Sequence, residues 1–225
     1  MEVNPVQPAK PKKRRTQADR TASTKKALIE ATIRVLNRVG YTGTTTALIA
    51  EEAGTSRGAI LHQFGTRLEL MVEVVKRVYE NELRDYGPLL KAEPHQGHRI
   101  SEFPEVIWGV LSRPAGVAVL EIFLGARSDA DLAKRIRPTQ IQIERDGMKH
   151  VRAILAVDEE TLVAAMRLIV WSARGLSLAQ TLVEKPEELR ASVLLLRRLF
   201  ELAESAGQLP QKATHTRPSR RSSAA

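Results

Sequence analysis

Apolar side chains recur along this chain every three or four residues, which is the spacing of one face of a helix. The first such run spans residues 23–39 and stops at Gly40. A longer run over residues 68–86 stops at Gly87-Pro88, and its stripe consists of Leu70, Met71, Val74, Val75 and Val78. No segment alternates apolar and polar residues as a strand does, and no internal repeat is visible. The pattern predicts an all-α chain.

Further helices are predicted in the second half of the chain. Residues 87–104 form a linker rich in Gly and Pro, and the helices that follow span residues 104–111, 114–126, 129–155, 158–184 and 186–203. Pro138 is expected to kink or interrupt the third of these helices, and Asp158 is expected to cap the fourth. In the last helix, apolar residues alternate by four and three, a seam typical of helix–helix packing: Leu189, Val193, Leu196, Phe200 and Ala203.

Two short helical patterns in residues 44–67, TTTALIAEEAGTSRGAILHQFGTR, are separated only by AGTS. Gly54 can take the left-handed conformation that a tight stop after the first helix requires. The Ser56 hydroxyl can cap the second helix, whose buried face would hold Ile60 and Phe64. The opposite face carries one arginine among mostly short side chains, which suits a helix that enters the major groove of DNA. The pattern predicts a DNA-binding helix-turn-helix.

Residues 25–70 resemble the N-terminal part of the TetR family of bacterial transcription regulators. The match keeps a fixed register and includes Leu28, Ile29, Ala31, Val35, Leu36, Gly40, Tyr41, Thr44, Thr45, Ile49, Ala50, Ala53, Gly54, Ser56, Gly58, Ile60, Phe64, Thr66 and Arg67. The resemblance implies three N-terminal helices for DNA and a larger helical domain for ligand binding and dimerisation. Three positions differ, with Ala59 for the usual Thr, Leu61 for Tyr and Gln63 for His. The operator sequence therefore does not carry over.

The residues expected to meet DNA lie at helix N-termini and on the exposed face of the second short helix. Arg57 could pair with a guanine edge, contact a phosphate or be solvated, and Gln63 could bond an adenine or a phosphate. Gly58 indicates close backbone approach, because glycine inside a helix costs up to about 1 kcal/mol. For the threonines, ordinary capping is the alternative to phosphate binding, and for His62 it is solvation. The predicted set is Thr44, Thr45, Thr55, Ser56, Arg57, Gly58, Ala59, Leu61, His62, Gln63, Thr66 and Arg67, with Lys12, Lys13, Arg14 and Arg15.

The net charge of +9 lies in the two ends of the chain, because residues 1–26 carry eight basic against two acidic groups and residues 208–225 carry four basic groups. Residues 1–22 are predicted to be a disordered basic arm and residues 208–225 a disordered basic tail. Between them we predict a DNA-binding domain at 23–69 and a regulatory and dimerisation domain at 70–207. The arm is either a solubilising tail or a segment that reaches phosphates or the minor groove.

Candidates for a small-molecule site lie in the regulatory helices. Trp108, Phe123, Met166 and Trp171 are large side chains that more often fill a core than a pocket, and Arg127, Ser172 and Arg174 are the polar groups nearby in sequence. His95 and His98 look like a metal motif, but no third ligand stands near them and the chain has no cysteine. We therefore predict an unknown effector and neither a metal nor a cofactor.

No secretory signal is visible, and the most apolar stretch, residues 115–126, is too short to cross a bilayer. These features predict a cytoplasmic protein without a membrane partner. The leading hypothesis is a ligand-responsive repressor that binds a palindromic operator as a homodimer, with Leu189, Val193, Leu196 and Phe200 at the dimer interface. Two alternatives are an enzyme, for which no catalytic motif is present, and a helical partner-binding protein whose DNA function has weakened.

Overall fold

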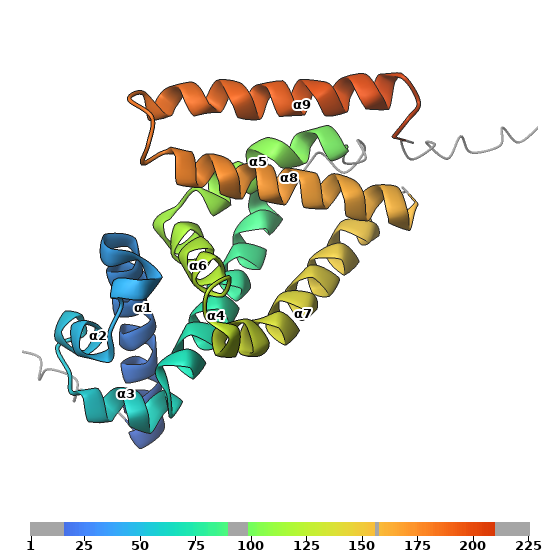
Figure 1. The fold of residues 1–225 in the computed structure, drawn as a ribbon. Coiled ribbons are helices and arrows are strands. Elements are labelled where there is room, and N and C mark those ends of the chain that lie inside the picture. The colour runs from blue at the N-terminus through green and yellow to red at the C-terminus, as the bar shows by residue number, and fades with distance from the viewer. Residues whose placement is uncertain (1–15, 90–98, 156–157, 210–225) are drawn as a thin grey trace, which may run out of the picture.

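This computed structural model describes residues 16–89, 99–155 and 158–209, and every regular element in these ranges is helical. Three helices form one end of the molecule (Figure 1): α1 (Gln17–Gly43), α2 (Thr46–Glu52) and α3 (Arg57–Phe64). The larger remainder contains α4 (Arg67–Leu89), α5 (Phe103–Leu111), α6 (Pro114–Gly125), α7 (Ala130–Ile154), α8 (Glu159–Ala179) and α9 (Leu189–Ser205). Single 3-10 turns, η1 (Ile100–Glu102) and η2 (Pro186–Glu188), precede α5 and α9. The prediction of an all-α fold with a helix-turn-helix domain and a larger helical domain is confirmed.

The first helix begins earlier than its apolar pattern predicted. Thr16 Oγ1 accepts a hydrogen bond from Asp19 N at 3.1 Å, and Asp19 Oδ2 accepts one from Thr16 N at 3.0 Å. This reciprocal capping box satisfies donors that the first turn would otherwise leave unpaired. Residues 17–22 are therefore helical, so the predicted disordered arm over residues 1–22 is wrong for that part, while residues 1–15 lie outside the described residues.

The predicted turn between α2 and α3 is confirmed in its details. Gly54 has φ of 62°, the left-handed conformation that ends α2 without steric cost. Ser56 Oγ accepts a hydrogen bond from Ala59 N at 3.2 Å and so caps α3. Ile60 and Phe64 are buried on the inner face of α3. These contacts fix the direction of α3 and leave its outer face toward solvent.

Several predicted helix ends shift in the folded chain. Helix α4 continues through Gly87 and Pro88 to Leu89, and α8 ends at Ala179 instead of near Glu184. Helix α7 continues through Pro138 without a break. Proline removes one backbone donor, but packing of a long amphipathic helix can offset that local loss.

The described residues pack around two apolar cores. In the first core, Leu70 and Met71 of α4 lie together with Leu28 of α1, Ile49 of α2 and Ile60 of α3. Helix α4 thus belongs to the DNA-binding unit as well as to the larger domain, and no gap in packing marks the predicted boundary after residue 69. The second core lies among α5, the end of α7, α8 and α9. In Figure 1, α4, α7 and α8 form three sides of a triangle with α5 and α6 beside them.

Helix α8 is long and apolar enough by composition to cross a membrane. In this fold it is a core helix, because Leu162, Met166, Ile169 and Ala173 are buried against its neighbours. It also holds a buried arginine, Arg174. Interior packing accounts for part of its apolar composition, while Leu168 and Trp171 are exposed on its other side.

Candidate nucleic-acid interface and interior cavity

The outer face of α3 gathers most of the residues that the sequence placed at a nucleic acid. Arg57, Gly58 and His62 are exposed, and Leu61 is 55% exposed although it is apolar. Thr55 and Ser56 are exposed just before the helix, while Ala59 and Gln63 are half-buried at its edges. Arg57 has no ion-pair partner among the described residues. One helix thus presents a cation, an apolar side chain and two polar side chains on one surface.

Packing does not explain the glycine at position 58. Its backbone is not in the left-handed region, and a Cβ built there would meet only Ser56 Oγ, at 3.6 Å, which is an ordinary contact. Alanine would fit the folded chain and favour the helix by up to about 1 kcal/mol. The missing side chain therefore leaves room outside the protein, as a helix that lies close to a nucleic acid requires.

Thr45 and Thr66 occupy helix N-termini beside this surface. Thr45 Oγ1 accepts a hydrogen bond from Leu48 N at 3.2 Å, and Thr66 Oγ1 accepts one from Glu69 N at 3.1 Å. Both threonines are exposed, and each hydroxyl can still donate its own hydrogen to a phosphate. Both threonines therefore cap helices, and this role does not prevent either hydroxyl from contacting a phosphate.

Thr44 does not belong to this surface. Only 1% of the residue is exposed, and its hydroxyl donates to the Gly40 carbonyl at 2.6 Å. The predicted DNA contact of the Thr44 side chain is therefore wrong, because the kink of α1 at Gly40 leaves a carbonyl that this hydroxyl satisfies in the interior.

The phosphate contact of Arg67 stays a prediction, and the structure gives its guanidinium a role inside the fold. Its Nε donates to Thr44 O at 2.7 Å, and its Nη2 donates to Tyr41 O at 2.6 Å. A third hydrogen bond runs from Nη1 to the Tyr41 hydroxyl at 3.0 Å, and the guanidinium lies 4.2 Å from the centre of the Tyr41 ring. The rigid fork of donors thus satisfies backbone carbonyls at the end of α1, so Arg67 braces the fold.

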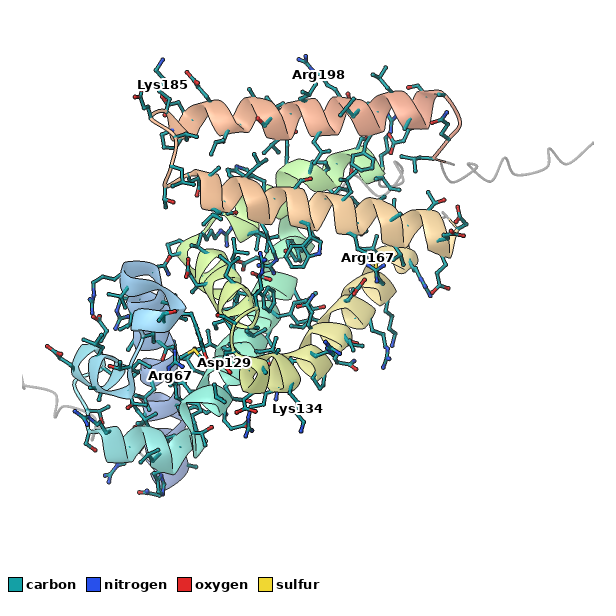
Figure 2. All side chains as sticks on the ribbon, viewed as in Figure 1. Arg67, Asp129, Lys134, Arg167, Lys185 and Arg198 are labelled. Atoms are coloured by element: carbon teal, nitrogen blue, oxygen red, sulfur yellow. The ribbon has the colours of Figure 1, made fainter. Side chains whose placement is uncertain are left out.

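Tyr41 connects this brace to the larger domain. Its hydroxyl donates to Asp129 Oδ2 at 2.6 Å, and Asp129 Oδ1 accepts from Leu132 N at 2.9 Å to cap α7. The hydrogen bond from Tyr41 lowers the pKa of the Asp129 carboxyl, while burial raises the pKa of Tyr41. A Cβ on Gly125 would lie 2.2 Å from the Tyr41 ring, so α6 approaches that ring closely. Figure 2 shows Arg67 and Asp129 together at the junction of the two domains.

Two ion-pair clusters hold α1 against its neighbours. Glu52 accepts from Arg34 at 2.6 Å and from Arg38 at 2.9 Å, and these hydrogen bonds lower the pKa of the Glu52 carboxyl. Lys25 Nζ pairs with Glu73 at 2.7 Å and lies 5.6 Å from the centre of the Phe64 ring. These basic groups are engaged in binding α1 to α2 and α4.

A cavity of about 360 Å³ lies inside the triangle of α4, α7 and α8, with α5 beside it. Of the predicted ligand residues, Met166 and Trp171 line it. Trp108, Phe123 and Arg127 do not line it, which corrects the predicted set: Trp108 packs on the second core, and Phe123 contacts Trp171 with ring centroids 6.3 Å apart. Arg127 is exposed beyond the end of α6.

Two ionisable groups that are far apart in the sequence line this cavity together. Glu82 of α4 and Arg174 of α8 both line it and are 7% and 8% exposed. Burial raises the pKa of Glu82 to about 7. The sequence pointed to Arg174 as one of three polar groups near the large side chains. It gave no signal for Glu82, because nothing in the local sequence distinguishes this glutamate from residues on the solvated face of an amphipathic helix.

The predicted dimer seam on α9 faces the interior. Val193 and Phe200 are 2% and 7% exposed, and Leu189 and Leu196 are half-buried. Val193 and Phe200 are thus covered within their own chain, which places them away from a partner surface, whereas the assignment of the half-buried Leu189 and Leu196 to a dimer interface stays a prediction. The exposed apolar side chains of α9 lie on the neighbouring face, and exposed apolar or small residues also line α8; together we call them the α8–α9 stripe: Ala164, Leu168, Trp171, Gly175, Leu195, Leu199 and Leu202.

Some predicted sites lie outside the described residues. They are the basic residues Lys12, Lys13, Arg14 and Arg15 and the histidines His95 and His98. Within the described ranges, no group of three or more His, Asp or Glu side chains could hold a metal ion.

The fold and the exposed α3 define a helix-turn-helix transcription regulator, and comparison with known proteins agrees. A model of the family described as "Bacterial regulatory proteins, tetR family" matches residues 28–74. The regulator CymR of Pseudomonas putida is 32% identical over 199 residues, which cover 83% of this chain and 95% of CymR. The regulator BetI of Vibrio vulnificus is 37% identical over 71 residues, covering 32% of this chain and 36% of BetI. The chain therefore belongs to the TetR family of transcriptional regulators.

Solved structures share the whole architecture at lower identity. The multidrug binding protein EbrR, crystallised with imidazole, gives a TM-score of 0.61 at 22% identity and covers 87% of this chain and 95% of EbrR. A transcriptional regulator from Rhodococcus sp. Rha1 gives a TM-score of 0.59 at 18% identity and covers 80% of this chain and 96% of its own. At these identities the likeness concerns the fold.

Proposed function

We propose that the protein is a ligand-responsive repressor that binds a palindromic operator as a homodimer in the bacterial cytoplasm. The observation that carries the proposal is the connection between an exposed helix α3 and an interior cavity in one chain. Helix α4 joins them, because it follows α3 directly and also lines the cavity with Glu82 and other side chains. The proposal assigns the chain no catalytic step and no cofactor.

In the DNA complex, α3 would enter the major groove. Arg57 can donate to a guanine edge, Leu61 can contact a thymine methyl group, and Gln63 can bond an adenine. Thr45, Thr66 and the backbone at Ser56 would hold phosphates at helix N-termini and fix the register. Because Ala59 and Leu61 replace a Thr and a Tyr of the family pattern, we expect readout to depend more on apolar contact and on Arg57.

Two copies would associate through the α8–α9 stripe. Leu195, Leu199 and Leu202 are 58%, 55% and 66% exposed and recur on one face of α9, and Leu168 and Trp171 are about half exposed on α8. Exposed apolar side chains that recur on one face of a helix in this way indicate a protein interface. Two helices from each chain would form a four-helix bundle, whose symmetry matches a palindromic operator.

Effector binding would act through α7. The cavity is lined by Gln140, Met148 and other residues of this helix, and the first turn of the same helix is capped by Asp129 beside Tyr41. A ligand that moves α7 or α4 would change the separation of the two α3 helices and so favour one state over the other. The multidrug binding protein EbrR, which shares this fold and was crystallised with imidazole, supports a small-molecule site in the same architecture.

Repression needs only occupation of the operator, whereas activation also needs a surface for the transcription machinery, so we propose repression. The test is a gel shift with DNA upstream of the chain's own gene, followed by footprinting and a reporter fused to that promoter. A protected palindrome and higher reporter output after deletion of the gene would support the proposal. Absence of any shift at micromolar protein and low salt would overturn it in favour of a helical partner-binding protein.

A further inference from the structure

Three residues that line the cavity each have a buried side-chain atom without a hydrogen-bond partner in the described part of the chain. Arg174 Nη1, Glu82 Oε1 and Gln140 Oε1 are buried, and none has a hydrogen-bond partner among the described residues. Native proteins pair most buried polar atoms, so three unpaired atoms around one cavity indicate groups arranged for a ligand. They come from α8, α4 and α7, which are the three sides of the triangle.

The charge of the cavity follows from its ionisable groups. Arginine stays protonated in proteins, and Arg174 is buried with one face 5.2 Å from the centre of the Phe123 ring. Glu82 does not cancel this charge fully, because burial raises its pKa to about 7 and a share of the molecules carry it as a neutral acid at neutral pH. At the rim, Glu144 and Arg167 pair at 2.6 Å and so neutralise each other.

Most of the remaining wall is apolar, although Tyr79 and His150 also line the cavity. The apolar part includes Phe103, Ile107 and Leu111 of α5, Val151 of α7 and Val170 of α8, with Tyr86 of α4 also present. A volume of about 360 Å³ lies within the range of sites that take a small organic molecule. An aromatic ring with a short substituent fills such a space, whereas a sugar or nucleotide would leave many polar groups unpaired.

From this arrangement we propose that the effector is a small monocarboxylic acid with an apolar, aromatic body, whose carboxylate pairs with Arg174. The planar guanidinium offers a carboxylate two parallel donors, and the buried site strengthens that pair. Glu82 in its neutral form and Gln140 lie on the other two walls, where they can bond the carboxylate or a second polar group. This proposal rests on the proposed function, in which the cavity receives the effector.

A cationic aromatic ligand is the main competitor, because Glu82, Tyr79, Tyr86 and Trp171 all line the cavity and could hold it. The structure favours the acid, since a cation would be placed beside Arg174 in a medium that screens charge poorly. The two ligand classes make opposite predictions for one set of probes of equal shape.

The test measures binding to the full chain without DNA, by titration calorimetry and by tryptophan fluorescence, to which Trp171 in the cavity wall and Trp108 both contribute. The probes are phenylacetate, its neutral amide phenylacetamide, and phenethylammonium. We expect phenylacetate to bind at least tenfold more tightly than either of the others. Tighter binding of phenethylammonium, equal binding of acid and amide, or no binding of phenylacetate at millimolar concentration would overturn the proposal.

Variants locate the contact. Arg174→Gln should weaken phenylacetate binding at least tenfold and abolish the preference over the amide, while Arg174→Lys should keep part of it. Arg77→Gln is the matched control, because Arg77 is exposed on α4 and pairs only with Glu80 in the described structure, at 3.6 Å. If Arg174→Gln fails to fold, the comparison of the three probes on the wild type still decides. Unchanged preference in a folded Arg174→Gln variant would overturn the assignment.

The same measurements separate this inference from the proposed function. Binding of phenylacetate does not depend on operator DNA, so a protein that binds the acid and shows no specific gel shift would retain this inference and lose the repressor. A protein that protects an operator and prefers phenethylammonium would remain a repressor with an effector of the other class.

Discussion

The Tyr41 hydroxyl donates a hydrogen bond to Asp129 Oδ2 at 2.6 Å and so joins the last turn of α1 to the cap of α7. The two residues are 88 positions apart and belong to the two domains. Because α7 lines the cavity and α1 packs on α2 and α3, this contact lies on a short path between cavity and DNA-binding surface. A chain of packed side chains that both sites can bias is the physical basis of coupling.

Tyr41→Phe should lower stability by about 1 kcal/mol, since Asp129 keeps its cap and can rehydrate when the hydrogen bond is lost. We expect operator affinity to stay within about threefold, while release of the operator by phenylacetate needs more ligand. Urea unfolding and gel shifts with increasing ligand measure both effects. Asp129→Asn is a second test of the same contact, because asparagine can still cap α7 with its one oxygen but presents an NH2 group where Oδ2 accepts from Tyr41. An unchanged ligand response in Tyr41→Phe would exclude this contact from the coupling.

Arg67→Ala should destabilise the fold by about 3 kcal/mol. The substitution removes three hydrogen bonds to Tyr41 and Thr44, two of which leave backbone carbonyls without this partner. Operator binding should fall only as far as the folded fraction falls. Thermal melts with binding measured well below the midpoint separate the two effects. Normal melting with weaker binding to operator and random DNA alike would support Arg67 as a phosphate contact.

Arg57→Ala should weaken operator binding by about 1–3 kcal/mol, which is about fivefold to 150-fold, with little change on random DNA. Arg57 is exposed on α3 and packs on nothing that the fold needs, so the melting curve should not move. Gel shifts on operator and scrambled DNA at fixed salt give the two affinities. Equal losses on both DNAs would assign Arg57 to a phosphate and leave base reading to Leu61, His62 and Gln63.

Leu199→Glu should convert the dimer to a folded monomer, whereas Phe200→Glu should unfold α9. Leu199 is 55% exposed in the α8–α9 stripe, and its neighbour Phe200 is 7% exposed in the second core. A buried unpaired carboxylate costs several kcal/mol, while an exposed one mainly disrupts an apolar interface. Sedimentation and circular dichroism distinguish the outcomes. A Leu199→Glu protein that remains dimeric would place the interface elsewhere.

Glu82→Gln should remove a pH-dependent loss of stability. Burial raises the pKa of Glu82 from 4.5 to about 7, so the folded state holds its proton more tightly than the unfolded state. The resulting stabilisation is complete below about pH 4.5 and is lost as pH rises through 7. Relative to the variant, the wild type should lose about 3 kcal/mol between pH 4.5 and 8.

Urea unfolding across this pH range, for both proteins, measures the difference. Parallel curves would mean that Glu82 titrates near its ordinary value. The other ionisable groups around the cavity are shared by the two proteins and cancel in the comparison: Tyr79, Asp85, Tyr86, Arg113, Glu144, His150, Arg167 and Arg174.

Short-range pattern determined the helices and the class of protein. Gly54, Ser56, Thr66 and Asp129 mark helix ends by what a side chain can do for the backbone within three residues, so these ends could be predicted without the fold. The capping box of Thr16 and Asp19 carries the same kind of local signal, and it was missed because the apolar pattern begins only later. The exposed face of α3 also follows from the sequence, since Ile60 and Phe64 define its buried side.

Only the tertiary structure decided whether a residue is buried or exposed where the sequence pattern allows both. Leu194, Leu195 and Leu196 surround much of α9, so periodicity allows two apolar faces, and only the neighbouring α5 and α8 determine which face is covered. The sequence placed Arg67 at a helix N-terminus, where its guanidinium could reach a phosphate. In the fold, the kink at Gly40 brings the carbonyls of Tyr41 and Thr44 within hydrogen-bonding distance of this guanidinium. Glu82 and Arg174 line one cavity only because the fold brings α4 and α8 around it. The two residues are far apart in the sequence, so no local sequence pattern predicts that they lie in the same cavity.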